Sequence, residues 1–216
     1  MGKNDRDELT TSGWDSITEI FDKIHPGRQV EHYGVLVPWE LGGNDPLRGI
    51  SVYDAGDYWH FVTYGLSELY EKESKDLEWS GYGMEFTLKL KKRNKNEMKS
   101  EENELNAEFR CVCGNLQSIA RLTFTQGELF LPNEYIYTGQ TIGIDLKQTS
   151  KLTGFILVED ELAGMIYTPN GKVQFVELIG ATDAELKAII DKKLRVKELF
   201  ERLDSEYTDY ERESLF

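Results

Sequence analysis

The alternation of apolar and polar residues is clearest in residues 84–90. Every second residue there is apolar, as in a strand with one face in the core and one in water. A dense apolar and aromatic run at residues 59–70 precedes it and predicts another strand at residues 58–66. The acidic, glycine-flanked stretch between them, residues 71–83, is expected to be a surface loop that presents a binding site. The apolar set is Met84, Phe86, Leu88 and Leu90, and the polar set is Glu85, Thr87 and Lys89.

Three other stretches have the three- and four-residue spacing of apolar positions that one helix face requires. The first covers residues 14–24, with Ser12 as its expected N-cap. The second covers residues 105–124 and ends at Gly127, a residue type that favours helix termination. The third opens with a capping box formed by Thr182 and Glu185. Their apolar positions are Trp14, Ile17, Phe21 and Ile24; Leu105, Phe109, Val112, Leu116 and Ile119; and Leu186, Ile189, Ile190 and Leu194.

Shorter apolar runs predict the remaining strands, and Pro169-Asn170-Gly171 favours a hairpin turn between the last two. The sequence contains no internal repeat and no Pro- or Ser-rich linker. We therefore predict an α+β fold in which helices flank a mixed, largely antiparallel sheet in a single domain. The predicted strands lie at residues 33–39, 49–53, 154–158, 165–167 and 173–179, with short apolar segments at 129–131, 135–137 and 142–146.

Charge marks the ends of the predicted domain. We expect residues 1–12 to be a flexible lead, residues 13–203 the folded domain, and residues 204–216 an acidic C-terminal tail. The tail is expected to be an exposed arm, because its acids outnumber a single arginine, Arg212. Residues 91–104 have no apolar face, which predicts an exposed loop or a poorly ordered insertion. The acids of the tail are Asp204, Glu206, Asp209, Glu211 and Glu213.

The net charge limits the classes of partner. With 39 acidic and 25 basic residues the formal charge is −14, which argues against nucleic acid and against an anionic membrane. Such acidity fits a basic protein partner, and it also fits a protein that is charged for solubility alone. No apolar leader or membrane-length apolar run is present, so we expect a cytoplasmic protein. Cys111 and Cys113 are expected to be reduced, because on a helix their side chains diverge by roughly 200°.

No catalytic or metal-binding motif is found. His25, His32 and His60 have no metal-ligand spacing, and no nucleophile elbow, P-loop or dinucleotide motif occurs. We therefore expect no cofactor, no metal and no enzyme activity. One catalytic cluster is conceivable, His60 beside Tyr64 and Tyr70, and the alternative is a half-buried histidine with satisfied hydrogen bonds.

A group of stretches spread along the chain has the residues and the order of a known family: residues 41–47, 51–53, 59–70 (WHFVTYGLSELY), 80–88 (SGYGMEFTL), 119–124, 168–175 and 177–182. Taken together, they resemble the Suppressor of fused domain in its single-domain, bacterial form. That resemblance implies an α+β domain without catalysis. Animal members of the family hold a short peptide of a transcription factor in the cytoplasm. Bacterial members are commonly encoded beside secreted toxins, often nucleases, and act as immunity proteins.

The resemblance also indicates where a partner would bind. In the animal proteins a tyrosine at the place of Tyr70 and an aspartate in the following loop contact the peptide. Leu77 stands at the place of that aspartate, with Asp76 and Glu78 on either side. Aromatic residues beside acids are typical of binding hot spots. The predicted partner-binding residues are therefore Tyr70, Asp76, Glu78 and Trp79.

Each of these residues also has a structural alternative, and the function has more than one reading. Tyr70 and Trp79 could pack against the core, and the acids could serve solubility. The first functional hypothesis is a cytoplasmic immunity protein that neutralises a basic toxin, such as a nuclease. The second is a signalling adaptor that sequesters a regulatory protein or transcription factor. The third is an enzyme with an unrecognised site, which would require His60 and a carboxylate to converge in a pocket.

Overall fold

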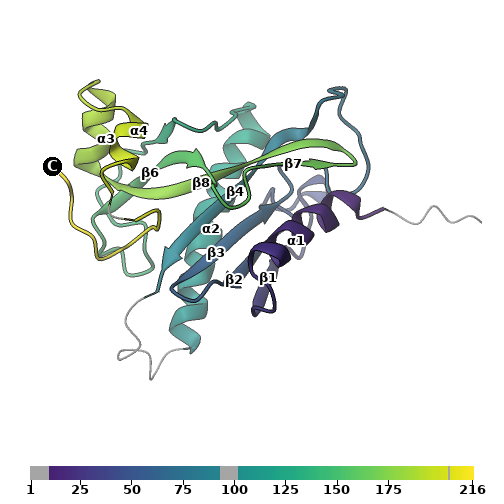
Figure 1. Cartoon of the computed structure of the whole chain (residues 1–216), viewed down its shortest axis with the longest axis horizontal. Helices are drawn as coiled ribbons and strands as arrows, with labels where there is room; N and C mark the ends of the chain where they lie inside the picture. Colours follow the sequence, from purple (N-terminus) through teal and green to yellow (C-terminus); the bar gives the residue numbers. More distant parts are fainter. Residues whose placement is uncertain (1–9, 93–101, 204) are drawn as a thin grey trace, which may run out of the picture.

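The chain is built on one mixed sheet of eight strands with helices on both faces (Figure 1). The computed structural model describes residues 10–92, 102–203 and 205–216. Strands follow the order β1-β2-β3-β4-β8-β6-β5, and β7 pairs with β8 outside this path. Every strand pair is antiparallel except β4 with β8. The predicted α+β class with a mixed, largely antiparallel sheet is confirmed. The elements are α1 (Ser12–Ile24), β1 (Val30–Gly34), a 3₁₀ turn (Trp39–Leu41), β2 (Gly49–Asp54), β3 (Tyr58–Tyr64), β4 (Trp79–Lys91), α2 (Glu102–Gln126), β5 (Tyr135–Ile136), β6 (Leu152–Glu159), β7 (Met165–Thr168), β8 (Gly171–Thr182), α3 (Asp183–Ile190) and α4 (Val196–Phe200).

Strand β4 is buried on both faces, which corrects the expectation that its polar residues face water. Glu85 and Thr87 are 0% exposed and Lys89 is 1% exposed. Helix α2 covers the face of Phe86, where Phe109 joins the largest core cluster. The opposite face is covered by α1 near β3 and by α3 and α4 near β6 (Figure 1). A central strand between two helical layers has no solvent side, so its polar residues need partners inside the protein.

The first strand differs from its prediction at residues 33–39. Strand β1 ends at Gly34, and residues 39–41 form a 3₁₀ turn. Pro38 precedes this turn and cannot donate a ladder hydrogen bond, so it is a poor strand residue. The apolar segments at residues 129–131 and 142–146 form no strand.

Helix ends agree with their predicted signals, with one exception. The capping box of Thr182 and Glu185 is present at the start of α3. Gly127 follows α2 with φ +73°, a conformation that glycine adopts at little cost. The N-cap of α1 is Thr11 and makes no side-chain capping bond. Ser12, the expected cap, instead donates its hydroxyl to the Tyr70 carbonyl at 3.4 Å.

The longest helix, α2, carries both cysteines as free thiols. Burial raises the pKa of Cys111 to about 11 and that of Cys113 to about 12, so both are thiols near neutral pH. Across the ranges that the structure describes, no helix combines the length and the apolar character that crossing a bilayer requires.

The C-terminal residues are packed against the sheet, which corrects the expectation of an exposed arm. We name residues 205–216 the C-terminal strap. Thr208 is 1% exposed, and Arg212 forms an ion pair at 2.6 Å with Glu185, whose side chain is 0% exposed. The charged insertion predicted at residues 91–104 and the lead predicted at residues 1–12 lie largely outside the described residues.

Candidate protein-binding surface

The buried carboxyl group of Glu85 holds the start of the loop between β3 and β4 in place. This carboxylate accepts hydrogen bonds from the Thr63 hydroxyl at 2.6 Å and from the Gly65 amide at 2.8 Å. It also accepts the amide and the hydroxyl of Ser67, at 2.9 and 2.7 Å. Burial raises the pKa of Glu85 to about 7, although these four donors oppose the rise. Glu85, one of the alternating polar residues of β4, is therefore the anchor of the loop.

A second carboxylate, that of Glu68, organises the loop from within. It accepts the amides of Glu73 at 2.7 Å and Gly81 at 3.1 Å, and the amide of Ser74 by a short hydrogen bond. Lys72 pairs with the same carboxylate at 3.2 Å. Burial works against ionisation of Glu68, but the three amides outweigh it and lower its pKa. The acidic loop is thus an ordered surface with defined hydrogen bonds.

Asp76 closes the turn that leads into β4. Its Oδ1 accepts the amides of Glu78 at 2.8 Å and Trp79 at 3.1 Å. These two amides lower the pKa of Asp76. Leu77, at the tip of the turn, is 93% exposed. Asp76 therefore shapes the turn and leaves an apolar side chain in solvent.

Trp79 belongs to a row of three side chains that crosses β4, β8 and β7. Lys172 is the cross-strand partner of both Trp79 and Tyr167. Its Nζ lies 5.8 Å from the Trp79 ring centre and 5.6 Å from the Tyr167 ring centre. The same Nζ lies 2.6 Å from the Glu78 carboxylate. We call Trp79, Lys172 and Tyr167 the aromatic row.

The aromatic row is a solvent-facing surface with further apolar side chains beside it. Tyr167 is 72% exposed, and Met165, two residues earlier on β7, is 40% exposed. Trp79 is half-buried, because its ring lies against Gly83, where an added Cβ would come within 3.0 Å of the ring. Lysine between two aromatic faces is a favourable arrangement that also orders the rings.

Tyr70 is not part of the aromatic row. Its side chain packs against the core cluster under α1, and its carbonyl accepts the Asn170 amide group at 3.1 Å. Asn170 also donates to the Glu68 carbonyl at 2.8 Å. The turn residue therefore joins the β7–β8 hairpin to the loop. Of the predicted residues, Asp76, Glu78 and Trp79 lie together, and Tyr70 lines a separate pocket.

That pocket, of about 240 Å³, is the concave part of the surface. Tyr82 and Phe124 meet in it with ring centres 5.2 Å apart. Arg48 pairs with Glu40 at 3.0 Å on its rim. Apolar walls with an acidic rim suit an extended peptide that carries a basic side chain. The lining residues are Glu40, Arg48, Gly65, Leu66, Ser67, Glu68, Leu69, Tyr70, Glu71, Glu73, Gly81, Tyr82 and Phe124.

The histidines form a buried network away from this surface. His60 Nε2 lies 3.0 Å from Asp160, and its Nδ1 lies 2.9 Å from His25. Burial lowers the pKa of His60, and it lowers that of His25 to about 4. His60 and Asp160 do converge, as the enzyme hypothesis requires, but both side chains are 0% exposed. A substrate in solution therefore does not reach the pair.

The sequence alone did not identify Lys172, Tyr167, Glu68 or Glu85 as parts of this surface. The hairpin turn does place Tyr167 opposite Lys172. The parallel pairing of β4 with β8, which adds Trp79 to them, has no local sequence signal. Within the described ranges, no group of three or more His, Cys, Asp or Glu residues is arranged to hold a metal ion.

Solved structures with a similar fold agree with this architecture. The chain aligns with a protein in the Sufu–Fu complex with a TM-score of 0.77, at 24% identity, over 94% of this chain and 92% of that one. Drosophila Suppressor of Fused gives a TM-score of 0.78 at 24% identity, over 94% of this chain and 51% of that one. A Suppressor of fused homologue from Neisseria gonorrhoeae gives 0.59 at 14% identity, over 93% of this chain and 94% of that one.

Sequence comparison extends the likeness beyond the fold. The Suppressor of fused homologs of Homo sapiens and Mus musculus are each 27% identical to this chain in an alignment of 165 residues that covers 70% of this chain. The match covers 31% of their length, so this chain spans about a third of these relatives. The family model for Suppressor of fused protein matches residues 43–213. The chain therefore belongs to the Suppressor of fused family.

Proposed function

We propose that this chain is a non-catalytic domain that binds and holds a regulatory protein in the cytoplasm. The proposed contact surface joins the aromatic row, the turn at Asp76–Glu78 and the pocket beside Tyr70. Exposed aromatic side chains on a rigid support bind with little loss of conformational freedom. The complex in which a structural relative was solved, Sufu with Fu, supports protein binding as the activity.

The main observation in favour of this function is that hydrogen bonds from beneath hold the exposed surface in one shape. Two carboxylates, those of Glu68 and Glu85, fix the loop through its backbone amides. Asn170 then joins that loop to the hairpin that carries Tyr167. A surface held in shape by hydrogen bonds to two carboxyl groups beneath it is preorganised, which is the arrangement expected of a binding site.

The test is capture of the partner with matched variants. The full chain, the double variant Trp79→Ala/Tyr167→Ala and the control Tyr135→Ala are each used as bait with cross-linking and mass spectrometry. Tyr135 is 40% exposed but lies on β5, at the far edge of the sheet. A regulatory protein retained by the full chain and by the control, but lost with the double variant, supports the proposal. Equal retention by all three baits would contradict it.

A second candidate function, the immunity protein, is favoured by the net charge of −14. A nuclease needs a positively charged surface to hold phosphates, so an acidic chain could cover that surface by charge complementarity. Coexpression with the product of the neighbouring gene tests this candidate. Rescue of growth together with formation of a stable complex would support it, and toxicity without a complex would count against it.

A further inference from the structure

The C-terminal strap crosses the sheet where β4 and β8 separate. These two strands pair directly from Met84 with Gln174 to Thr87 with Glu177. Further along, Thr208 lies between them and forms a parallel bridge with Leu90. Its amide donates to the Lys89 carbonyl at 2.8 Å, and its carbonyl accepts the Lys91 amide at 3.0 Å. On the other side, the Gly180 amide donates to the Thr208 hydroxyl at 2.9 Å. We name this gap the strand slot.

Side chains of the strap are held on both faces of the sheet. Tyr207 stacks on Tyr58 with ring centres 4.5 Å apart, on the face that α1 covers. Tyr210 packs against the core cluster on the face that α2 covers. The strap therefore lies in the plane of the sheet at Thr208, with side chains on both faces. Such a segment makes the contacts of a bound peptide strand, with backbone hydrogen bonds in the plane and side-chain pockets on alternate faces.

The charges of the slot complement those of the strap. Lys91 pairs with Asp209 at 2.7 Å, and Lys89 lies 3.6 Å from Glu206. In a third pair the charges are reversed, because Arg212 of the strap donates to both carboxylate oxygens of Glu185 in α3, at 2.7 and 2.6 Å. Arg212 also donates to the Gly180 carbonyl at 2.8 Å. The slot thus selects an acidic strand with an arginine four residues after its central threonine.

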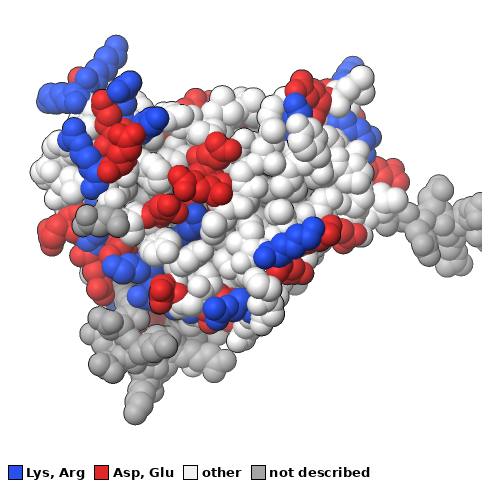
Figure 2. All heavy atoms as spheres, in the orientation of Figure 1, with Lys and Arg blue, Asp and Glu red and all other residues white. Residues whose placement is uncertain are grey.

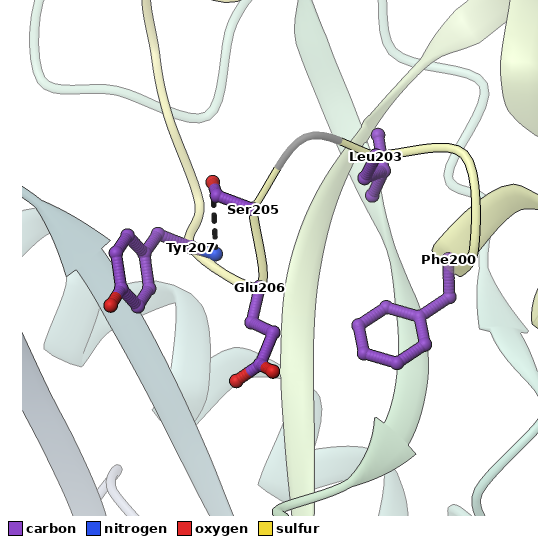
Figure 3. A pocket seen from close by; sticks show the side chains of 5 residues that line it. All are labelled: Phe200, Leu203, Ser205, Glu206 and Tyr207. Atoms are coloured by element: carbon purple, nitrogen blue, oxygen red, sulfur yellow. Dashed lines mark hydrogen bonds between the residues drawn. The ribbon is translucent and has the colours of Figure 1, made fainter.

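A pocket of about 530 Å³ lies at the end of α4 and the first residues of the strap, and it is lined by Phe200, Leu203, Ser205, Glu206 and Tyr207. Glu206 projects between the rings of Tyr207 and Phe200, and the Tyr207 amide donates to the Ser205 hydroxyl at 3.4 Å (Figure 3). Acidic side chains gather in the middle of this face of the molecule, between α1 and α3 (Figure 2).

We propose that the strand slot is a binding site for an extended acidic peptide strand, and that its exchangeable ligand is the strap of a second copy of this chain. A second copy presents the same threonine, tyrosines and arginine, so exchange replaces each contact by an identical one. Exchange of an identical element is a low-cost route to a dimer. The complementary charges described above identify the strap as the occupant.

The first experiment measures binding of a fluorescein-labelled peptide with the sequence of residues 205–216. Anisotropy is recorded with the wild-type full chain and with Arg212→Glu and Thr208→Pro, which release their own straps. We expect each released variant to bind the peptide at least 10-fold more tightly than the wild type, whose slot is filled. A control peptide carrying Arg212→Glu should not bind. Circular dichroism verifies that the variants are folded.

The second experiment tests the occupant by sedimentation velocity on mixed full-length variants. Arg212→Glu and Glu185→Arg each place like charges together within one chain. Mixing the two lets the strap of the first meet the slot of the second with opposite charges. We expect a heterodimer in the mixture and monomers in each variant alone.

Several results would overturn the proposal. A folded, released variant that fails to bind the peptide would remove the strand site, as would equal binding by the wild type. Peptide binding without a heterodimer would exclude the second copy as the ligand. Unfolding of both released variants would make the strap a permanent part of the core.

Discussion

At one end of the β4–β8 pair, near Trp79 and Lys172, the side chains face solvent, whereas at the other end the chain's own strap fills the gap. Both ends pose the same problem, because parallel strands that separate leave backbone groups that need partners. Near Leu90 the backbone and side chain of Thr208 supply them. Near Trp79 the Lys172 amide donates to the Glu78 carbonyl at 2.8 Å, and the register then shifts before Met84.

The comparison assigns different roles to buried and exposed side chains in this fold: buried ones should act on stability and exposed ones on binding. The Leu90 end joins the core to the ion pair between half-buried Arg212 and buried Glu185, so its side chains should act on stability. The Trp79 end carries side chains such as Tyr167, which is 72% exposed, so they should act on binding. Changes at the two ends should therefore have different measured consequences.

The largest effect is expected at the Leu90 end. Arg212→Ala leaves the buried Glu185 carboxylate without its cation, which should lower the free energy of unfolding by about 3 kcal/mol or more. Urea denaturation measures the change. The matched control is Lys193→Ala, whose pair with Asp191 is 73% and 54% exposed and should contribute less than about 1 kcal/mol. Equal effects of the two substitutions would mean that the strap is not anchored through Arg212.

The next effect concerns the buried anchor beneath the Trp79 end. The pKa of Glu85 is raised from 4.5 to about 7 in the folded chain, so between these pH values the folded state binds the extra proton. Stability from this group is present below pH 4.5 and is lost as pH rises toward 7. Because glutamine does not ionise, Glu85→Gln should not lose this stability as the pH rises. From pH 4.5 to pH 8 the stability of the variant relative to wild type should rise by about 3 kcal/mol.

The comparison between variant and wild type isolates Glu85 from the buried histidines. Burial lowers the pKa of His25 and His60, so those groups add stability as pH rises toward 6.5 in both proteins. Urea denaturation at several pH values measures the difference. A pH-independent difference would show that Glu85 does not hold its proton in the fold.

Substitutions in the aromatic row are expected to change stability less and to weaken partner binding clearly. Tyr167→Ala and Trp79→Ala should each weaken partner binding at least about 10-fold. Tyr167→Ala should leave the unfolding free energy within about 0.5 kcal/mol, the range of surface substitutions. Isothermal titration with the captured partner and urea denaturation provide the two readouts. Unfolding caused by Trp79→Ala would assign that residue to the core.

The smallest effect, and the one that distinguishes the partner classes, is expected for Lys172→Met. Loss of the cation leaves Glu78 unneutralised on the surface. A basic partner should then bind about two- to fivefold more tightly, mainly through faster association at low salt. An acidic partner should bind more weakly. The sign of the change in affinity therefore separates a basic partner from an acidic one.

Local patterns in the sequence predicted the elements and the fold class well. The alternation at Met84–Leu90 identified β4, and the signals at Gly127 and Thr182 identified helix ends. The same alternation led to the wrong inference that Glu85, Thr87 and Lys89 face water. Their partners include Thr63 and Ser67 on the preceding segment and Asp160 and Glu177 far along the chain. Pairings over such separations leave no periodic signal.

Contacts between distant segments also explain which parts of the surface and of the strap could not be predicted from the sequence. Asp76, Glu78 and Trp79 were predicted as contact residues because aromatic and acidic residues adjoin in the sequence. Their binding role stays a prediction. Lys172 and Tyr167 reach Trp79 through the parallel β4–β8 pair, which the sequence does not reveal. The exposed arm was predicted from the acids of the strap, whereas Thr208 is buried and Arg212 is half-buried by contacts with β4, β8 and α3.

The most direct test of the difference between the two ends is amide hydrogen exchange of the full chain with and without its captured partner. We expect added protection at residues 76–82 and 165–172 and no change at residues 88–91 and 178–182. Protection confined to the second pair of segments, or none in the first, would contradict the assignment of the Trp79 end as the partner-binding surface.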